Sequence, residues 1–301
     1  MISKLRFSER DSMQRNNLRK WSLLLGAVAI VALPMPSWAQ LTKYDLESRM
    51  GVESHVGNIT GHAKAAKADY RRYCVVCHGE LGDGNGESFP WIDPKPRDFQ
   101  LGVFKCRSTP TGTLPTDQDL FDTLARGLDR SNMPQWSTFT KQQRADLVAW
   151  VKHFSPRWTN EKPGTPITIP PEPEVTPERI KAGRDVFARV QCWKCHGVLG
   201  QANGPSAATL TDDLGRPIAA YNFTEGARPK CGDTDRDIYR IFMTGLDGTP
   251  MPSFADNIKP DEAWDLVFYL RTLMSQNSKE KAMAKQLGLK PVDPNAPAGQ
   301  Q

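Results

Sequence analysis

Two groups of cysteine and histidine side chains have the types and the spacing needed to hold an iron porphyrin. The pattern Cys-x-x-Cys-His occurs twice, 118 positions apart, at Cys74, Cys77 and His78 and at Cys192, Cys195 and His196. Two cysteines three residues apart can form thioether bonds with the two vinyl groups of one haem, and the adjacent histidine can then bind the iron. The two pairs could instead hold one zinc ion, but a four-thiolate site needs no histidine after each pair. The pattern therefore predicts two covalently bound haem c groups.

Each predicted haem iron also needs a sixth ligand or an open position. Met133 and Met251 each lie 55 residues after the predicted histidine ligand, and each precedes a proline. A methionine in a helical protein often serves only to fill the core, but the matched offset favours binding to iron through the thioether sulfur. We therefore predict four metal ligands, His78 with Met133 and His196 with Met251. With both axial positions of each iron filled, no catalytic residue is predicted.

The haem pattern is part of a longer repeat. The sequences Gly127-Leu128-Asp129 and Gly245-Leu246-Asp247 also lie 118 residues apart, and repeats of this length indicate duplicated domains. Seven prolines between residues 155 and 177 predict an extended linker, and the polar end of the chain predicts disorder. The predicted organisation is a signal peptide (1–39), an N-terminal extension (40–63), a first domain (64–155), a Pro-rich linker (156–176), a second domain (177–275) and a disordered polar tail (276–301).

The elements that position these residues are predicted to be helices. Helical patterns cover 65–73, 117–126 and 141–154 in the first repeat and 177–190, 235–244 and 260–274 in the second. Alternating strand patterns are not found, and glycine and proline fill the loops. The predicted fold class is all-α, with two tandem domains in which each haem supplies part of a core that so short a domain otherwise lacks.

The first 39 residues have the composition of an export signal. Six basic residues lie in the first 20, the stretch from Leu23 to Leu33 has no polar side chain, and small residues at Ser37 and Ala39 suit a signal peptidase. The apolar run is shorter than the roughly 20 residues that span a bilayer. We therefore predict a periplasmic protein cleaved after Ala39. Membrane association is expected only through a partner or an uncleaved N-terminus.

Most of the net positive charge belongs to this segment. The whole chain has a net charge of +5, of which +4 lies in residues 1–39. The four ionised propionate groups of two haems would make the mature protein slightly negative. No nucleic acid partner is therefore expected.

Each repeat resembles a class I cytochrome c domain, in its helix before the cysteine pair, Cys-x-x-Cys-His-Gly, glycine-rich loop, Met-Pro and closing helix. The two in tandem resemble the two-domain dihaem cytochromes c over nearly all of residues 64–275. The resemblance implies that each histidine ligand donates its other ring proton to a backbone carbonyl near a proline. Pro90, Pro94 and Pro96 are candidates in the first repeat and Pro205 in the second. It also implies aromatic packing round the haems by Trp136, Trp150, Phe254 and Tyr269.

Two of the six cysteines, Cys106 and Cys231, are not needed for thioether bonds. Each follows a lysine, and they lie 125 residues apart. A disulfide between them is possible in an oxidising compartment and would clamp the two domains together. The alternative is a pair of unpaired thiols, one of which could fill an apolar site or bind iron. The sequence leaves both alternatives open.

Two haems with His and Met ligands favour single-electron transfer. We predict a periplasmic dihaem electron-transfer protein that takes electrons from a dehydrogenase or quinol-oxidising complex and passes them to an oxidase or reductase. An alternative is a dihaem oxidoreductase, thiosulfate dehydrogenase-like or peroxidase-like, in which one iron has lost its methionine or binds Cys106. A further alternative is a haem subunit of a larger respiratory complex.

Overall fold

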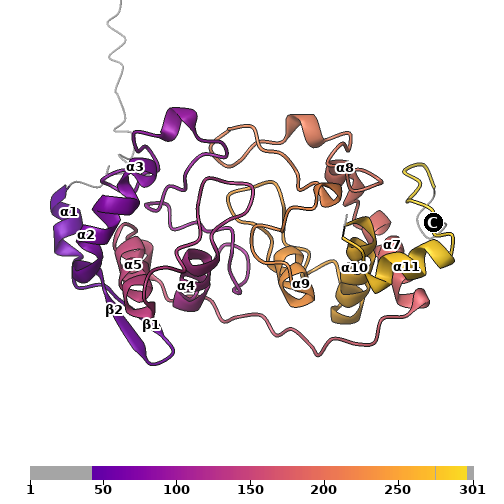
Figure 1. Ribbon diagram of the computed structural model, residues 1–301, viewed down its shortest axis with the longest axis horizontal. Coiled ribbons are helices and arrows are strands. Elements are labelled where there is room, and N and C mark those ends of the chain that lie inside the picture. Colours follow the sequence, from indigo (N-terminus) through magenta and orange to yellow (C-terminus); the bar gives the residue numbers. More distant parts are fainter. Residues whose placement is uncertain (1–42, 275, 297–301) are drawn as a thin grey trace, which may run out of the picture. The chain divides into compact units, whose positions relative to one another are not determined.

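The computed structural model describes residues 43–274 and 276–296 (Figure 1). The predicted signal peptide lies outside these residues. The first repeat and its flanks contain α1 (Lys43–Ser48), β1 (Glu53–Val56), β2 (Ile59–His62), α2 (Ala63–Tyr73), α3 (Val75–His78), η1 (Phe89–Trp91), α4 (Asp117–Arg126), α5 (Lys141–His153) and α6 (Arg157–Asn160). The second contains α7 (Pro177–Arg189), α8 (Trp193–His196), η2 (Ala207–Thr209), η3 (Phe223–Glu225), α9 (Asp235–Thr244), α10 (Pro260–Leu273) and α11 (Lys279–Gln286).

The starts of the main helices follow from local hydrogen bonding. The side chains of Thr116, Thr140 and Thr234 each accept a hydrogen bond from a backbone N–H in the first turn of α4, α5 and α9. In return, the backbone N–H of each threonine donates to the side chain three residues later. This capping box satisfies N–H groups that have no partner inside the helix. Thr176 caps α7, with Pro177 at its first position, where a missing N–H is harmless.

Each repeat has its own hydrophobic core. In the first, α2 packs against α5, and the buried side chains include Tyr70, Leu147 and Phe154. In the second, α7 packs against α10. This packing is so close at Gly183 that a Cβ atom there would lie 1.9 Å from the carbonyl oxygen of Asp265. The helices thus form the predicted two domains of one fold type.

The N-terminal extension contains a β-hairpin that the sequence did not predict. Strands β1 and β2 pair antiparallel and lie against α5 (Figure 1). The Ser54 hydroxyl donates to the carbonyl of Ala145 at 2.7 Å, and the His62 N–H donates to Asp146 at 2.8 Å. Strands of four residues are too short to give a clear alternating pattern, so only the contacts with α5 reveal them.

The predicted disorder of residues 276–301 is wrong for much of this segment. Helix α11 begins after Ser278, which caps it, and it packs beside α7 and α10 (Figure 1). Met283 packs against the core of the second repeat, and Val292 is buried. The segment has only a few apolar side chains, too few to predict an ordered helix from its sequence alone. In the structure these side chains pack against α7 and α10, and this packing orders the helix.

Candidate haem-binding sites

The first site is built on the tight turn that follows α2. The His78 N–H donates to the carbonyl of Cys74 at 2.9 Å, which places both side chains on one short helical turn. The Nδ1 atom of His78 lies 3.2 Å from the carbonyl oxygen of Arg97, and its ring stacks on Phe99 at a centroid distance of 4.4 Å. A hydrogen bond from Nδ1–H leaves Nε2 as the free nitrogen. Arg97 directly follows Pro96, which was among the predicted positions.

The protonation state of this histidine also suits a metal ligand. Burial lowers the pKa of His78 to about 4. The imidazole is therefore neutral at pH 7 and has a lone pair to give to a metal. Burial raises the pKa of the neighbouring Cys74 thiol to about 12, so an unmodified Cys74 remains protonated there.

The loop after α4 holds Met133. Helix α4 ends at Arg126 and is capped by Gly127, whose φ of +72° is one that residues with side chains rarely adopt. The Leu128 N–H donates to the carbonyl of Met133 at 3.0 Å, and the Met133 N–H donates to the Ser131 hydroxyl at 3.2 Å. The loop is tied back to α4 by a bond of 2.9 Å from the Trp136 N–H to Leu124.

The side chains of the first site line one cavity. Its lining includes all four predicted haem-contacting residues of the first repeat, Cys74, Cys77, His78 and Met133. The other lining side chains are mostly apolar, as a porphyrin requires. The Nε1 atom of Trp136 in this lining is buried without a hydrogen-bond partner. A mostly apolar cavity with two thiols, a neutral imidazole and an unsatisfied donor fits a covalently bound haem.

The second site repeats this geometry with one difference. The Nδ1 atom of His196 lies 2.9 Å from the carbonyl oxygen of Tyr221, and its ring lies 5.0 Å from that of Phe223. The carbonyl is therefore not beside Pro205, and that expectation was wrong. It comes 25 residues after the histidine, against 19 in the first repeat, because the loop between them is longer.

Met251 is held as Met133 is. The Leu246 N–H donates to the carbonyl of Met251 at 3.0 Å, and the Met251 N–H donates to the Thr249 hydroxyl at 3.2 Å. Cys192, Cys195 and Met251 are all partly buried. The structure thus gives each predicted methionine the same local hydrogen bonds.

The aromatic side chains divide into two groups. Trp136 lines the first cavity, and Phe254 packs against the second core. Trp150 is not part of the described lining of the first cavity. It packs instead on Tyr70 and Phe154 between the helices. Tyr269 packs edge-on against Phe187 at 5.4 Å.

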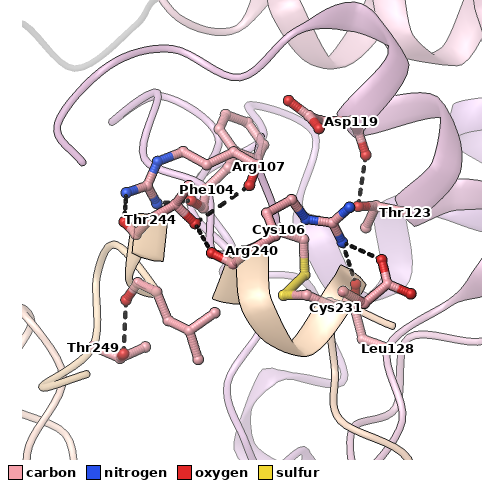
Figure 2. Close-up of a disulfide and its surroundings, with 12 residues drawn as sticks. Phe104, Cys106, Arg107, Asp119, Thr123, Leu128, Cys231, Arg240, Thr244 and Thr249 are labelled. Atoms are coloured by element: carbon pink, nitrogen blue, oxygen red, sulfur yellow. Dashed lines mark hydrogen bonds and ion pairs between the residues drawn. A yellow bond between two sulfur atoms is a disulfide. The ribbon is translucent and has the colours of Figure 1, made fainter. Parts of the chain in front are cut away.

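Cys106 and Cys231 form a disulfide that joins the two repeats (Figure 2). Their Cα atoms lie 5.1 Å apart, within the usual range for such a bond. Of the two alternatives that the sequence left open, the structure has the disulfide and not the pair of free thiols. Cys106 in this state has no free thiolate to give to iron.

Ion pairs also join the two repeats, and the sequence analysis missed them. Arg107 pairs with Asp247 of the second repeat at 2.6 Å. Its guanidinium also donates to the carbonyl of Thr244 (Figure 2). Asp129 of the first repeat pairs with Arg228 of the second at 2.9 Å. Both aspartates belong to the duplicated Gly-Leu-Asp sequence, and this duplication was the feature of the sequence that could have revealed the ion pairs. Each lies four residues before a predicted methionine ligand, so each methionine loop is bound to the other repeat.

Among the described residues, no three or more His, Cys, Asp and Glu side chains gather to hold a metal ion. The four cysteines of the two Cys-x-x-Cys-His patterns lie in separate sites, so nothing supports the four-thiolate zinc alternative. None of the helices within 43–274 and 276–296 has the length and apolar character to cross a bilayer.

Comparisons with known proteins agree with this arrangement. Residues 180–274 match the family model described as Cytochrome c, and residues 61–151 match the model described as Cytochrome C oxidase, cbb3-type, subunit III. No curated protein matches the chain. Among solved structures, a chain of the reducing HAO-like protein complex Kustc0457/Kustc0458 of Kuenenia stuttgartiensis is 42% identical, with a TM-score of 0.68. That match covers 69% of this chain and 95% of the other.

Proposed function

Because the chain belongs to the dihaem c-type cytochromes, we propose that it carries single electrons between redox proteins of the periplasm, through two haems that each have a His and a Met ligand. Haem iron supplies this chemistry by exchanging one electron between its ferric and ferrous states. The observation that carries the proposal is the equal construction of the loops around Met133 and Met251. Because both loops hold their methionine by the same hydrogen bonds, the two methionines have the same role, and this supports an iron ligand in each repeat.

Backbone carbonyls and the cavity lining prepare the sites for electron transfer. The carbonyls of Arg97 and Tyr221 fix the orientation of His78 and His196, so the imidazoles need not reorganise when the charge of the iron changes. The lining of the first cavity is largely apolar, which disfavours the entry of water. Both features favour electron transfer rather than catalysis at an open metal position.

The proposed location has two supports. The N-terminal sequence has the charge and apolar pattern of an export signal. The disulfide between Cys106 and Cys231 is of a kind that persists in oxidising compartments. The site of cleavage after Ala39 remains a prediction, which the N-terminal mass of the mature protein would test.

We also propose that the protein works within a complex, with a partner of the HAO-like class. The support is the 42% identity to a chain of a reducing HAO-like protein complex, over 95% of that chain. Co-purification from native cells tests this arm. Elution of all of the protein at the size of a monomer, in native extracts, would contradict it and leave the free carrier.

Ligand binding tests the carrier proposal against an enzyme with an open iron. We expect mass spectrometry to find two haems, and the ferrous wild-type protein to bind carbon monoxide slowly or not at all. Met133→Ala should open one haem to carbon monoxide, and Met251→Ala should open the other, as the matched control. Rapid binding to one haem of the wild-type protein would overturn the proposal in favour of an oxidoreductase.

A further inference from the structure

The first cavity is lined by a residue from the second repeat. Its lining contains two lysines, Lys105 and Lys230, and the second of these lies 125 positions further along the chain. Each immediately precedes one cysteine of the disulfide. The bond between Cys106 and Cys231 therefore brings the two ammonium groups to the same cavity.

Within residues 43–274 and 276–296, these two lysines have no carboxylate at ion-pair distance. Neither forms an ion pair within the part of the chain that the structure describes, although both are half-buried. Burial first, and then Arg97 and Lys230, lower the pKa of Lys105 to about 7. Burial, Arg130 and Arg97 lower the pKa of Lys230.

The acidic groups near these lysines do not satisfy them. The negative charge of Asp212 raises the pKa of Lys105, and that of Asp93 raises the pKa of Lys230. In each case burial lowers the pKa by more than the carboxylate raises it. Partly buried cations that repel one another are unfavourable without a paired anion. The cavity therefore lacks negative charge at this position.

A haem brings the missing charge, because its two propionate groups are carboxylates. We propose that Lys105 and Lys230 together form a carboxylate-binding site, shared by the two repeats, for the propionates of the haem in the first cavity. This inference rests on the proposed function only in requiring a haem there. The second repeat then completes the first haem site, and the disulfide positions Lys230 to do so.

The consequence is electrostatic. The ferric haem carries one more positive charge than the ferrous haem, so a nearby ammonium group favours the reduced state. Removal of either lysine charge should lower the midpoint potential of the first haem. Both lysines line the first cavity, so the potential of the second haem should change little.

Redox titration of the full haem-loaded protein tests this inference. We expect Lys230→Gln to lower one midpoint potential, that of the haem which Met133→Ala opens to carbon monoxide. Lys230→Arg should retain most of the wild-type value, because it keeps the charge. Lys67→Gln, at an exposed position on α2, is the matched control and should leave both potentials unchanged.

A second variant protects the test against misfolding. If Lys230→Gln yields little protein with two haems, Lys105→Gln should give the same selective decrease. Unchanged potentials in haem-loaded Lys105→Gln and Lys230→Gln proteins would overturn the inference and leave the proposed function standing. Rapid carbon monoxide binding by the wild-type protein would instead overturn the proposed function and leave the lysine site open to the same titration.

Discussion

Phe99 and Phe223 show how single residues shape the two sites. Each lies two positions after the residue whose carbonyl faces the histidine ligand, and its ring contacts that histidine. Each also donates its N–H to the carbonyl of a glycine in the loop after the haem pattern, Gly82 at 2.7 Å and Gly200 at 2.8 Å. One aromatic residue thus ties the carbonyl, the imidazole and the loop together.

Phe99→Ala should therefore destabilise the first repeat. Removal of a buried phenylalanine leaves a cavity, which typically lowers the free energy of unfolding by about 3 to 5 kcal/mol. Denaturant unfolding followed by haem absorbance measures the loss. Trp91→Ala is the matched control, because Trp91 is 85% exposed, and its effect should stay within about 0.5 kcal/mol. Equal losses in the two variants would contradict this role of Phe99.

At the scale of elements, the sequence predicted helices with strong end signals. Helices α4 and α9 have the predicted bounds, because a threonine cap and an apolar face mark them. The sequence did not predict the β1–β2 hairpin or α11, because these elements depend on packing against other parts of the chain. In the first site, the predicted Cys, His and Met residues line one cavity, and their types and spacing were readable in the sequence. The Tyr221 carbonyl was not, because the longer loop of the second repeat shifts it.

The turn that leads from α4 to Met133 depends on glycine. Gly127 has a φ of +72°, and a Cβ atom there would lie 2.7 Å from the N atom of Gln135. Gly127→Ala should cost about 1 to 3 kcal/mol in backbone strain, and it should displace the methionine loop. We expect this variant to bind carbon monoxide at the first haem.

The control for this variant is Gly51→Ala. Gly51 is exposed, and a Cβ atom there would have no neighbour within 4 Å. It should leave both stability and ligand binding unchanged. A Gly127→Ala protein that excludes carbon monoxide as the wild type does would show that the turn does not position Met133.

At the scale of the whole molecule, a disulfide and several ion pairs join the repeats in addition to the linker. Besides the disulfide, Arg107 pairs with Asp247, Arg228 with Asp129, and Arg130 with Glu225. A disulfide that closes a loop of more than 100 residues stabilises a protein by about 3 to 5 kcal/mol. The methionine loops take part in these contacts, so docking of the repeats and the state of each haem site are linked.

The duplicated aspartates allow the strength of this docking to be tested. The Arg107 side chain is 0% exposed and that of Asp247 is 16% exposed, whereas the Arg228 side chain is 51% exposed. Removing one partner of a buried pair leaves an uncompensated charge and typically costs about 3 to 5 kcal/mol. Exposed pairs contribute about 1 kcal/mol or less, because water and salt screen them.

Asp247→Ala should therefore lower the free energy of unfolding several-fold more than Asp129→Ala. The loss in Asp247→Ala also includes the hydrogen bonds that its carboxylate accepts from Thr111 and from the Gly112 N–H, at 2.7 and 2.8 Å. Denaturant unfolding of both variants, with the disulfide intact, measures the difference. Added salt should reduce the effect of Asp129→Ala but change that of Asp247→Ala little, because the Arg107–Asp247 pair is shielded from solvent. Similar losses in the two variants would mean that the interface around Arg107 opens to water in solution, and the repeats would then be held together mainly by their disulfide.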